Sequence, residues 1–199
     1  MARTQAADYD DRRKAIMATA ARLYALHGFL GASIAQIAAA GETSKSLIYH
    51  YYPSKEDILF DVMDSHVQGL VETALAVEAG SEEPRDKLRR LARDLMEHYE
   101  GAQSNQKVLL NELGNLPVDR RQDIVDRQRV VIDVVDRLLL AIRPDLAQDR
   151  PRRRSLTMLF FGMLNWTHTW FDPAGPIKSQ TIADDAAEMF LSGLAQPQA

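Results

Sequence analysis

The sequence predicts an all-α protein in which a three-helix head, residues 1–54, precedes a longer helical body, residues 55–199. Apolar residues recur at spacings of three and four along most of the chain, as they do on one face of an α-helix. Residues that cap or stop helices separate these stretches, and no stretch alternates as a β-strand would. With 199 residues, 46% of them hydrophobic, the chain can also bury a sizeable core.

The first predicted helix runs from about residue 10 to residue 26, and His27-Gly28 stops it. Residues of its buried face recur at helical spacing and are Ile16, Ala20, Leu23 and Tyr24. Because these residues lie on one face of a helix, we expect them to form the centre of the head.

The second predicted helix begins directly after Ser33. Ser33 and Gln36 have the spacing of a capping box, in which the serine oxygen accepts from the third amide and the glutamine reaches back. Gly41 ends the helix, because glycine adopts the left-handed conformation that closes helices without strain. The next residues able to cap a helix, 43 and 44, follow at once, so a tight turn joins this helix to the next.

The third predicted helix spans about residues 44–51 and is halted by Pro53. Ile48 and Tyr52 are four residues apart and turn toward the core. Two short helices joined by a tight turn are typical of a helix-turn-helix, whose second helix docks on DNA. The sequence therefore predicts a DNA-binding head.

Ser46 and His50 then point outward from this helix, with Leu47 and Tyr49 beside them. Lys45 lies in the first turn, where the amino end of a recognition helix meets phosphates and base edges. The alternative is that Tyr49 and His50 are ordinary surface residues of a core helix.

Residues 10–60, and above all Ile34 to Leu59, resemble the amino-terminal domain of the TetR family of bacterial transcription regulators. Residues that fall on the family pattern are Ile37, Ala38, Ser44, Lys45, Tyr49, His50, Tyr51, Lys55 and Glu56. Three positions depart from it: Glu42 stands where the pattern has its turn glycine, Thr43 replaces a valine and Tyr52 a phenylalanine. We therefore expect a slightly altered turn and an added negative charge near the docking surface.

The resemblance implies that Ser33, Lys45, Tyr49, His50 and Lys55 lie at positions that commonly contact DNA in such regulators. The candidate DNA-binding residues are Ser33, Ser44, Lys45, Ser46, Leu47, Tyr49, His50 and Lys55. Ser46 and Leu47 are the expected base readers. A serine can bond several bases and a leucine can only contact a thymine methyl, so we expect phosphate contacts and DNA shape to carry much of the recognition.

Overall charge would not have suggested a DNA-binding protein, because the formal net charge is -4. Up to Phe60, seven Lys or Arg stand against six acids, so affinity must come from the placement of the cations. Arg12, Arg13 and Lys14 begin the first helix. Arg3 lies in an unpatterned tail, for which we favour a solvated terminus over a reach into a DNA groove.

The absence of cysteine excludes disulfides and thiolate metal sites, and we expect neither a metal nor a cofactor. No signal peptide precedes the head, so we expect a cytoplasmic protein.

Beyond the head, a long helix from Lys55 to about residue 77 is expected to connect head and body, with Ser54 as its cap. Residues 79–85 combine glycine, proline and charge and break it. An amphipathic helix follows, marked by Leu88, Leu91, Ala92, Leu95 and Tyr99. A shorter helix at 104–116 and one that Pro117 opens, ending at Ile142, complete this part.

Residues 155–171 contain no Asp, Glu, Lys or Arg, and their apolar side chains surround the helix, which predicts burial on all sides. A membrane span is the alternative, but the segment is short and holds Asn165, Thr167 and His168, so we expect no membrane contact.

The last predicted helix has an apolar face with the small residues Ala183, Ala186 and Ala187, which permit close approach. Regulators that this chain resembles dimerise through their final two long helices as a four-helix bundle. The resemblance therefore implies a homodimer that places two heads on a palindromic operator.

Residues of ligand-capable type lie on otherwise apolar helices of the body. These candidate effector-binding residues are Tyr99, Asn111, Asn165, Trp166, His168 and Trp170. Each alone is more often a core residue, but ligand pockets are mostly apolar with a few polar groups. The run from Phe160 to Ile177 resembles TetR-type regulators that sense acyl-CoA thioesters. Residues 152–154 or Lys178 could supply cations for the CoA phosphates, although at least two of the three arginines are expected to be merely solvated.

Together these features predict a ligand-responsive repressor that binds operator DNA as a dimer. A sensor of hydrophobic drugs that controls an efflux gene is the alternative, followed by a DNA-binding dimer without effector. An enzyme is not expected. Although acids and histidines are close in Glu97-His98 and in residues 64–66, such neighbours on a helix do not face each other.

Overall fold

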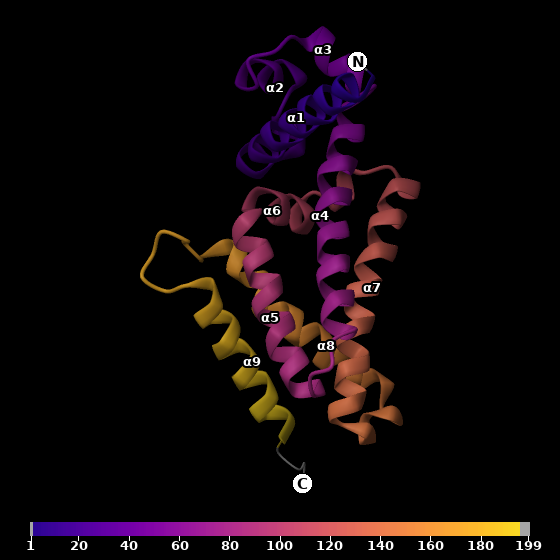
Figure 1. The fold of residues 1–199 in the computed structure, drawn as a ribbon, viewed down its shortest axis with the longest axis vertical. Coiled ribbons are helices and arrows are strands. Elements are labelled where there is room, and N and C mark those ends of the chain that lie inside the picture. Colours follow the sequence, from indigo (N-terminus) through magenta and orange to yellow (C-terminus); the bar gives the residue numbers. More distant parts are fainter. Residues whose placement is uncertain (1, 196–199) are drawn as a thin grey trace. The chain divides into compact units, whose positions relative to one another are not determined.

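The structure is a computed structural model that describes residues 2–195, with the side chains of residues 9–194. Every regular element in this described part of the chain is a helix, which confirms the all-α fold (Figure 1). The α-helices are α1 Ala2–Gly31, α2 Ile34–Ala40, α3 Lys45–Tyr51, α4 Lys55–Glu78, α5 Pro84–Gly101, α6 Gln103–Asn111, α7 Val118–Ile142, α8 Arg150–Asn165 and α9 Ser179–Ala195. Short 3-10 helices are η1 Leu113–Asn115, η2 Pro144–Ala147 and η3 Trp166–Thr169.

Two compact units make up the chain. The first contains the residues up to Val67 together with Ser104–Val125, and the second contains Gln68–Gln103 together with the residues from Asp126 onward. The long helix α4 belongs to both. The boundary between these compact units crosses α4 after Val67. The functional boundary at residue 55 is a different division of the chain and stays a prediction.

Helix α1 begins at Ala2, well before the predicted start near residue 10. The prediction of an unpatterned tail is therefore wrong, although the side chain of Arg3 lies outside the described residues. Periodicity could not detect this first part of α1, because it carries no apolar stripe. The predicted stop at Gly28 is confirmed as a break: its φ of 73° and ψ of 161° are not helical, and one more turn follows it.

The first unit buries side chains of α1, α2, α3 and the start of α4, together with side chains of residues 104–125. Its fully buried side chains include Tyr24, Ile37, Ile48, Ile58, Leu59 and Met63. Tyr24 and Phe29 meet edge-on, with 5.4 Å between ring centroids. Each fully buried aliphatic side chain contributes about 1.5–3 kcal/mol relative to exposure, so this short-helix head depends on its shared core.

In the second unit, α9 packs along α5, and Figure 1 shows the two helices side by side. The predicted apolar face of α5 is confirmed, because all five of its predicted residues are buried. Arg89 pairs with Glu188 at 2.6 Å, and Arg93 pairs with Asp184. Both pairs are partly exposed, so they contribute less than the apolar burial beneath them.

The composition of α8 predicts a helix buried on all sides, but within this chain one side of α8 is exposed. Met158 and Leu159 are 46% and 58% exposed, while Phe160 and Leu164 on the opposite side are buried. The regular helix also ends at Asn165, where η3 takes over. Among the described residues, no helix is both long and apolar enough to cross a membrane.

Two of the alanines expected at a dimer interface have another role. Ala183 and Ala187 are fully buried inside the protomer, where they let α9 approach α5 closely. Only Ala186 lines the outer groove described below. Arg153, one of the candidate phosphate cations, pairs with Asp136 at 2.8 Å and donates to the carbonyl of Leu146, so it is held within the unit.

Candidate nucleic-acid interface

The helix-turn-helix has the caps that the sequence predicts. The Gln36 amide donates to Ser33 Oγ at 3.2 Å, and the Ser33 amide donates to Gln36 Oε1 at 2.8 Å, which forms the capping box of α2. Ser44 Oγ accepts from the amide of Leu47 at 3.1 Å and caps α3. Ser54 and Asp57 cap α4 in the same reciprocal way. These caps satisfy amides that the helices cannot pair themselves.

The turn between α2 and α3 differs from the prediction in one respect. Gly41 has a φ of -93°, so it does not supply the left-handed residue; Glu42 does, with a φ of 50°. Gly41 instead lies in a place with little room for a side chain. A Cβ there would lie 3.2 Å from the Ile37 carbonyl oxygen, which is a tight contact, and 3.7 Å from Thr19 Oγ1, which is an ordinary one. The turn is therefore retained, with a glutamate in its strained position.

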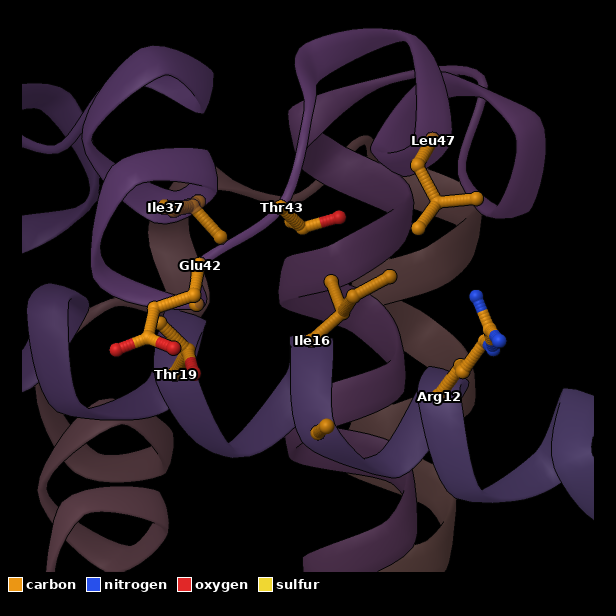
Figure 2. A pocket seen from close by; sticks show the side chains of 9 residues that line it. Arg12, Ile16, Thr19, Ile37, Glu42, Thr43 and Leu47 are labelled. Carbon is orange, nitrogen blue, oxygen red and sulfur yellow. The ribbon is translucent and has the colours of Figure 1, made fainter.

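A cavity of about 240 Å³ lies between α1 and this turn. Figure 2 shows the Glu42 carboxylate on one side of it, near Thr19, and the Arg12 guanidinium on the other. Leu47 reaches toward Ile16 and Arg12 and is half-buried (Figure 2). Leu47 thus has a packing role in the head, and less of its side chain is open to bases than predicted.

One face of α3 is exposed and polar while the other is buried. Ile48 is fully buried and Tyr52 is 3% exposed, whereas Lys45, Ser46, Tyr49 and His50 are all exposed. The predicted orientation of the recognition helix is confirmed. The DNA contacts of these four side chains stay a prediction.

Behind α3, a polar network fixes the helix to α1 and α4. The Tyr52 hydroxyl donates to Asp61 Oδ2 at 2.6 Å, and Arg13 pairs with the same carboxylate at 2.6 Å. Burial of the Tyr52 phenol and the nearby Asp61 carboxylate raise the pKa of Tyr52. Tyr52 is therefore a protonated donor at any physiological pH, which gives a reason for tyrosine where the family pattern has phenylalanine.

Lys55 does not point to the docking surface. Its Nζ donates to the carbonyl oxygens of Phe29 at 2.7 Å and Ala32 at 2.9 Å, and it lies 4.1 Å from the centroid of the Phe29 ring. The Tyr24 hydroxyl donates to the Lys55 carbonyl at 3.4 Å. We therefore remove the Lys55 side chain from the candidate interface and assign it to the packing of α1 against α4.

The candidate effector residues are only partly brought together. The Tyr99 hydroxyl donates to Asn165 Oδ1 at 3.0 Å, and His168 Nδ1 donates to the Asn165 carbonyl at 2.7 Å. Asn111 belongs to the other compact unit, where it is exposed and donates to the Lys107 carbonyl of its own helix. Asn111 is thus not part of this cluster.

Trp166 and Trp170 are exposed and line an open apolar groove of about 620 Å³ on the outer face of α8 and α9. Other apolar side chains of the groove are Met158, Leu159, Met163, Ile177, Ile182 and Met189. The sequence places Met189 on the apolar face expected to form the dimer interface, but it does not single out Met158 or Leu159. The signal for this groove was the lack of charge in residues 155–171, which could not tell internal burial from an apolar surface.

A capped helix-turn-helix on an all-helical chain defines a DNA-binding regulator. Residues 16–62 match the family model described as "Bacterial regulatory proteins, tetR family", and residues 81–194 match "Tetracyclin repressor-like, C-terminal domain". The chain therefore belongs to the TetR family of bacterial transcription regulators.

Known regulators are similar to this chain over most of its length. A TetR-family regulator from Bordetella parapertussis is 38% identical, with a TM-score of 0.90 over 96% of this chain and 100% of that one. AibR, solved in complex with isovaleryl coenzyme A and operator DNA, is 28% identical, with a TM-score of 0.77 over 89% of this chain and 97% of that one. The transcriptional repressor KstR2 of Mycolicibacterium smegmatis is 22% identical over 94% of this chain and 92% of its own length.

Membership of a family of regulators also decides against an enzyme. The two histidines that have acidic neighbours in the sequence take part in packing. His66 is buried and bonds through Nε2 to Gln106 Oε1 at 2.7 Å, and the His98 ring packs against Gly69. Glu97 and His98 are consecutive on α5 and do not face each other.

Substitution of Glu42 should separate backbone strain from charge. We expect Glu42→Gly to raise the free energy of unfolding by about 0.5–1 kcal/mol, because glycine adopts a positive φ without strain, offset in part by its larger unfolded-state entropy. Glu42→Gln keeps the strain and should leave stability unchanged. Urea unfolding followed by circular dichroism checks this, and equal stabilisation by both variants would show that strain is not the cause.

Proposed function

We propose that this chain is a repressor that binds a palindromic operator as a homodimer and leaves it when a small molecule of the acyl-CoA class binds the body. The observation that carries the proposal is the exposed face of α3, where Lys45, Ser46, Tyr49 and His50 stand on a helix whose opposite side is buried. A short helix with its amino end and one polar face open is suited to the major groove.

The assignment of roles follows the chemistry of each side chain. Lys45 and the hydroxyl of Ser44 are suited to phosphates, whereas the Ser33 hydroxyl already donates to Gln36 Oε1. Ser46, Tyr49 and His50 are the side chains that can reach base edges. Glu42 in the preceding turn repels phosphates, so non-specific affinity should be modest. Two heads on one operator then supply much of the binding free energy.

The homodimer is supported by the groove on α8 and α9. Its exposed apolar residues include Leu159, 58% exposed, and Met189, 71% exposed, and all lie on one continuous face. Exposed apolar patches of this kind mark sites of protein association. A two-fold dimer through this face would pair identical surfaces, as closed symmetry requires.

The effector class is supported by AibR, whose solved complex contains isovaleryl coenzyme A. In this chain, Tyr99, Asn165 and His168 form a hydrogen-bonded cluster in the second unit that could orient the polar part of such a ligand. Arg152, Arg154 and Lys178 are the cations that we propose for its phosphates, since Arg153 is held by Asp136.

Release of operator DNA tests this proposal. We expect isovaleryl-CoA or a longer acyl-CoA to weaken the operator complex by roughly 150-fold, which corresponds to about 3 kcal/mol of coupling between the sites. Fluorescence anisotropy of a labelled operator duplex measures it, with CoA and the free acid as controls. Release only by lipophilic cations would favour a drug sensor, and no binding of any palindromic duplex at low salt would refute the repressor itself.

A further inference from the structure

Two aromatic side chains join the amino-terminal part of α1 to the carboxyl-terminal end of α3. The rings of Tyr9 and Tyr51 lie 4.5 Å apart between centroids and are inclined by 37°. The His50 ring in turn meets Tyr51 edge-on, at 5.4 Å and 88°. A continuous row of three rings thus runs from α1 to the exposed face of the recognition helix.

One partner of this contact lies outside the segments that match the family models. The matched segments cover residues 16–62 and 81–194, so Tyr9 stands on the part of α1 that precedes both. Figure 1 shows this end of α1 beside α3. Tyr9 thus joins the row from outside the segment that matches the family model, whereas His50 and Tyr51 lie within it.

Helix α3 needs such support. It has only seven residues, fewer than a helix needs to be stable by itself, so contacts with other elements must fix its direction. Ser44 caps its amino end, and Tyr52 bonds to Asp61 on its buried side. The ring of Tyr9 is the contact that reaches Tyr51, at the carboxyl-terminal end of the helix.

We propose that Tyr9 is a positioning residue for DNA recognition, which holds α3 through Tyr51 and thereby fixes the ring of His50. This inference rests on the proposed binding of DNA by α3. Base readout requires side chains to be placed within about half an ångström, whereas phosphate contacts tolerate more movement. Loss of the Tyr9 ring should therefore reduce selectivity more than general affinity for DNA.

The test compares two substitutions of Tyr9. Wild-type protein first selects a duplex from a random pool, and fluorescence anisotropy then measures affinities for that duplex and for a shuffled one. We expect Tyr9→Leu to bind the selected duplex about ten-fold more weakly and the shuffled duplex within about two-fold of wild type, which is the order that loss of one aromatic pair in each head allows. Tyr9→Phe, which keeps the ring, should match wild type.

Two controls isolate the positioning role. Leu26→Ala removes an exposed side chain of the same helix and should change neither affinity. In a Tyr51→Leu background, Tyr9→Leu should have no further effect, because residues that act through one contact are not additive. Circular dichroism establishes that each variant is folded.

Several results would overturn the inference. A loss in Tyr9→Phe equal to that in Tyr9→Leu would mean that the hydroxyl contacts DNA directly, and a loss that persists in the Tyr51→Leu background would mean that Tyr9 does not act through Tyr51. Equal losses on both duplexes, or none, would exclude a role in selectivity. If wild type selects no duplex, the proposed function fails and the inference with it; a selective wild type with an unaffected Tyr9→Leu overturns the positioning role alone.

Discussion

Leu159→Arg should convert a dimer into a monomer and weaken operator binding by about 10²-fold or more. Leu159 is 58% exposed on α8 and lines the apolar groove, so an arginine there costs the single chain little. In a two-fold interface, however, each copy would bring a desolvated charge against the apolar face of the other. Because two linked heads bind 10²–10⁴-fold more tightly than one, the loss of the dimer should dominate the effect on DNA.

Measurement of mass and of affinity checks this prediction. Sedimentation equilibrium should give twice the chain mass of 22.4 kDa for the wild type and once that mass for Leu159→Arg. The matched control is Leu75→Arg, which changes another exposed leucine, on α4 of the same compact unit and outside the groove. If Leu159→Arg stayed dimeric with wild-type affinity, the groove on α8 and α9 would not be the dimer interface.

Local signals in the sequence predicted the head well. Helix caps act within a few residues, so Ser33, Ser44 and Ser54 fixed the starts of α2, α3 and α4. The spacing of Ile48 and Tyr52 likewise oriented α3. These features depend on neighbours three or four residues away, which a single sequence displays.

Contacts between distant residues were harder to predict. The preference of glycine for positive φ predicted the left-handed conformation at Gly41, but Glu42 adopts it. Gly41 instead lies where a Cβ would approach the Ile37 carbonyl oxygen to 3.2 Å. The start of α1 was missed because Tyr9 is held by Tyr51, from a different helix, and not by an apolar stripe. Similarly, the uncharged residues of α8 indicated burial, but they did not indicate whether the chain itself or a partner covers each side of the helix.

The contacts of Lys55 with distant residues were likewise not predicted from the sequence. Substitution of Lys55 has the largest expected effect on the stability of the head. We expect Lys55→Met to lower the free energy of unfolding by about 1–3 kcal/mol, because the methionine retains the apolar stem but leaves the carbonyls of Phe29 and Ala32 without their donor. Loss of the cation above the Phe29 ring adds to this cost. Urea unfolding followed by far-ultraviolet circular dichroism measures the change.

Lys45→Met is the matched control for Lys55→Met. It makes the same substitution at a lysine that is exposed at the start of α3. It should leave stability unchanged but weaken binding to every duplex and reduce the salt dependence by about one counterion for each bound head. Lys55→Met should leave the salt dependence as it is. If Lys55→Met instead reduced the salt dependence without loss of stability, its ammonium would bind a phosphate in the complex, and the contacts with Phe29 and Ala32 would have to give way when the head docks on DNA.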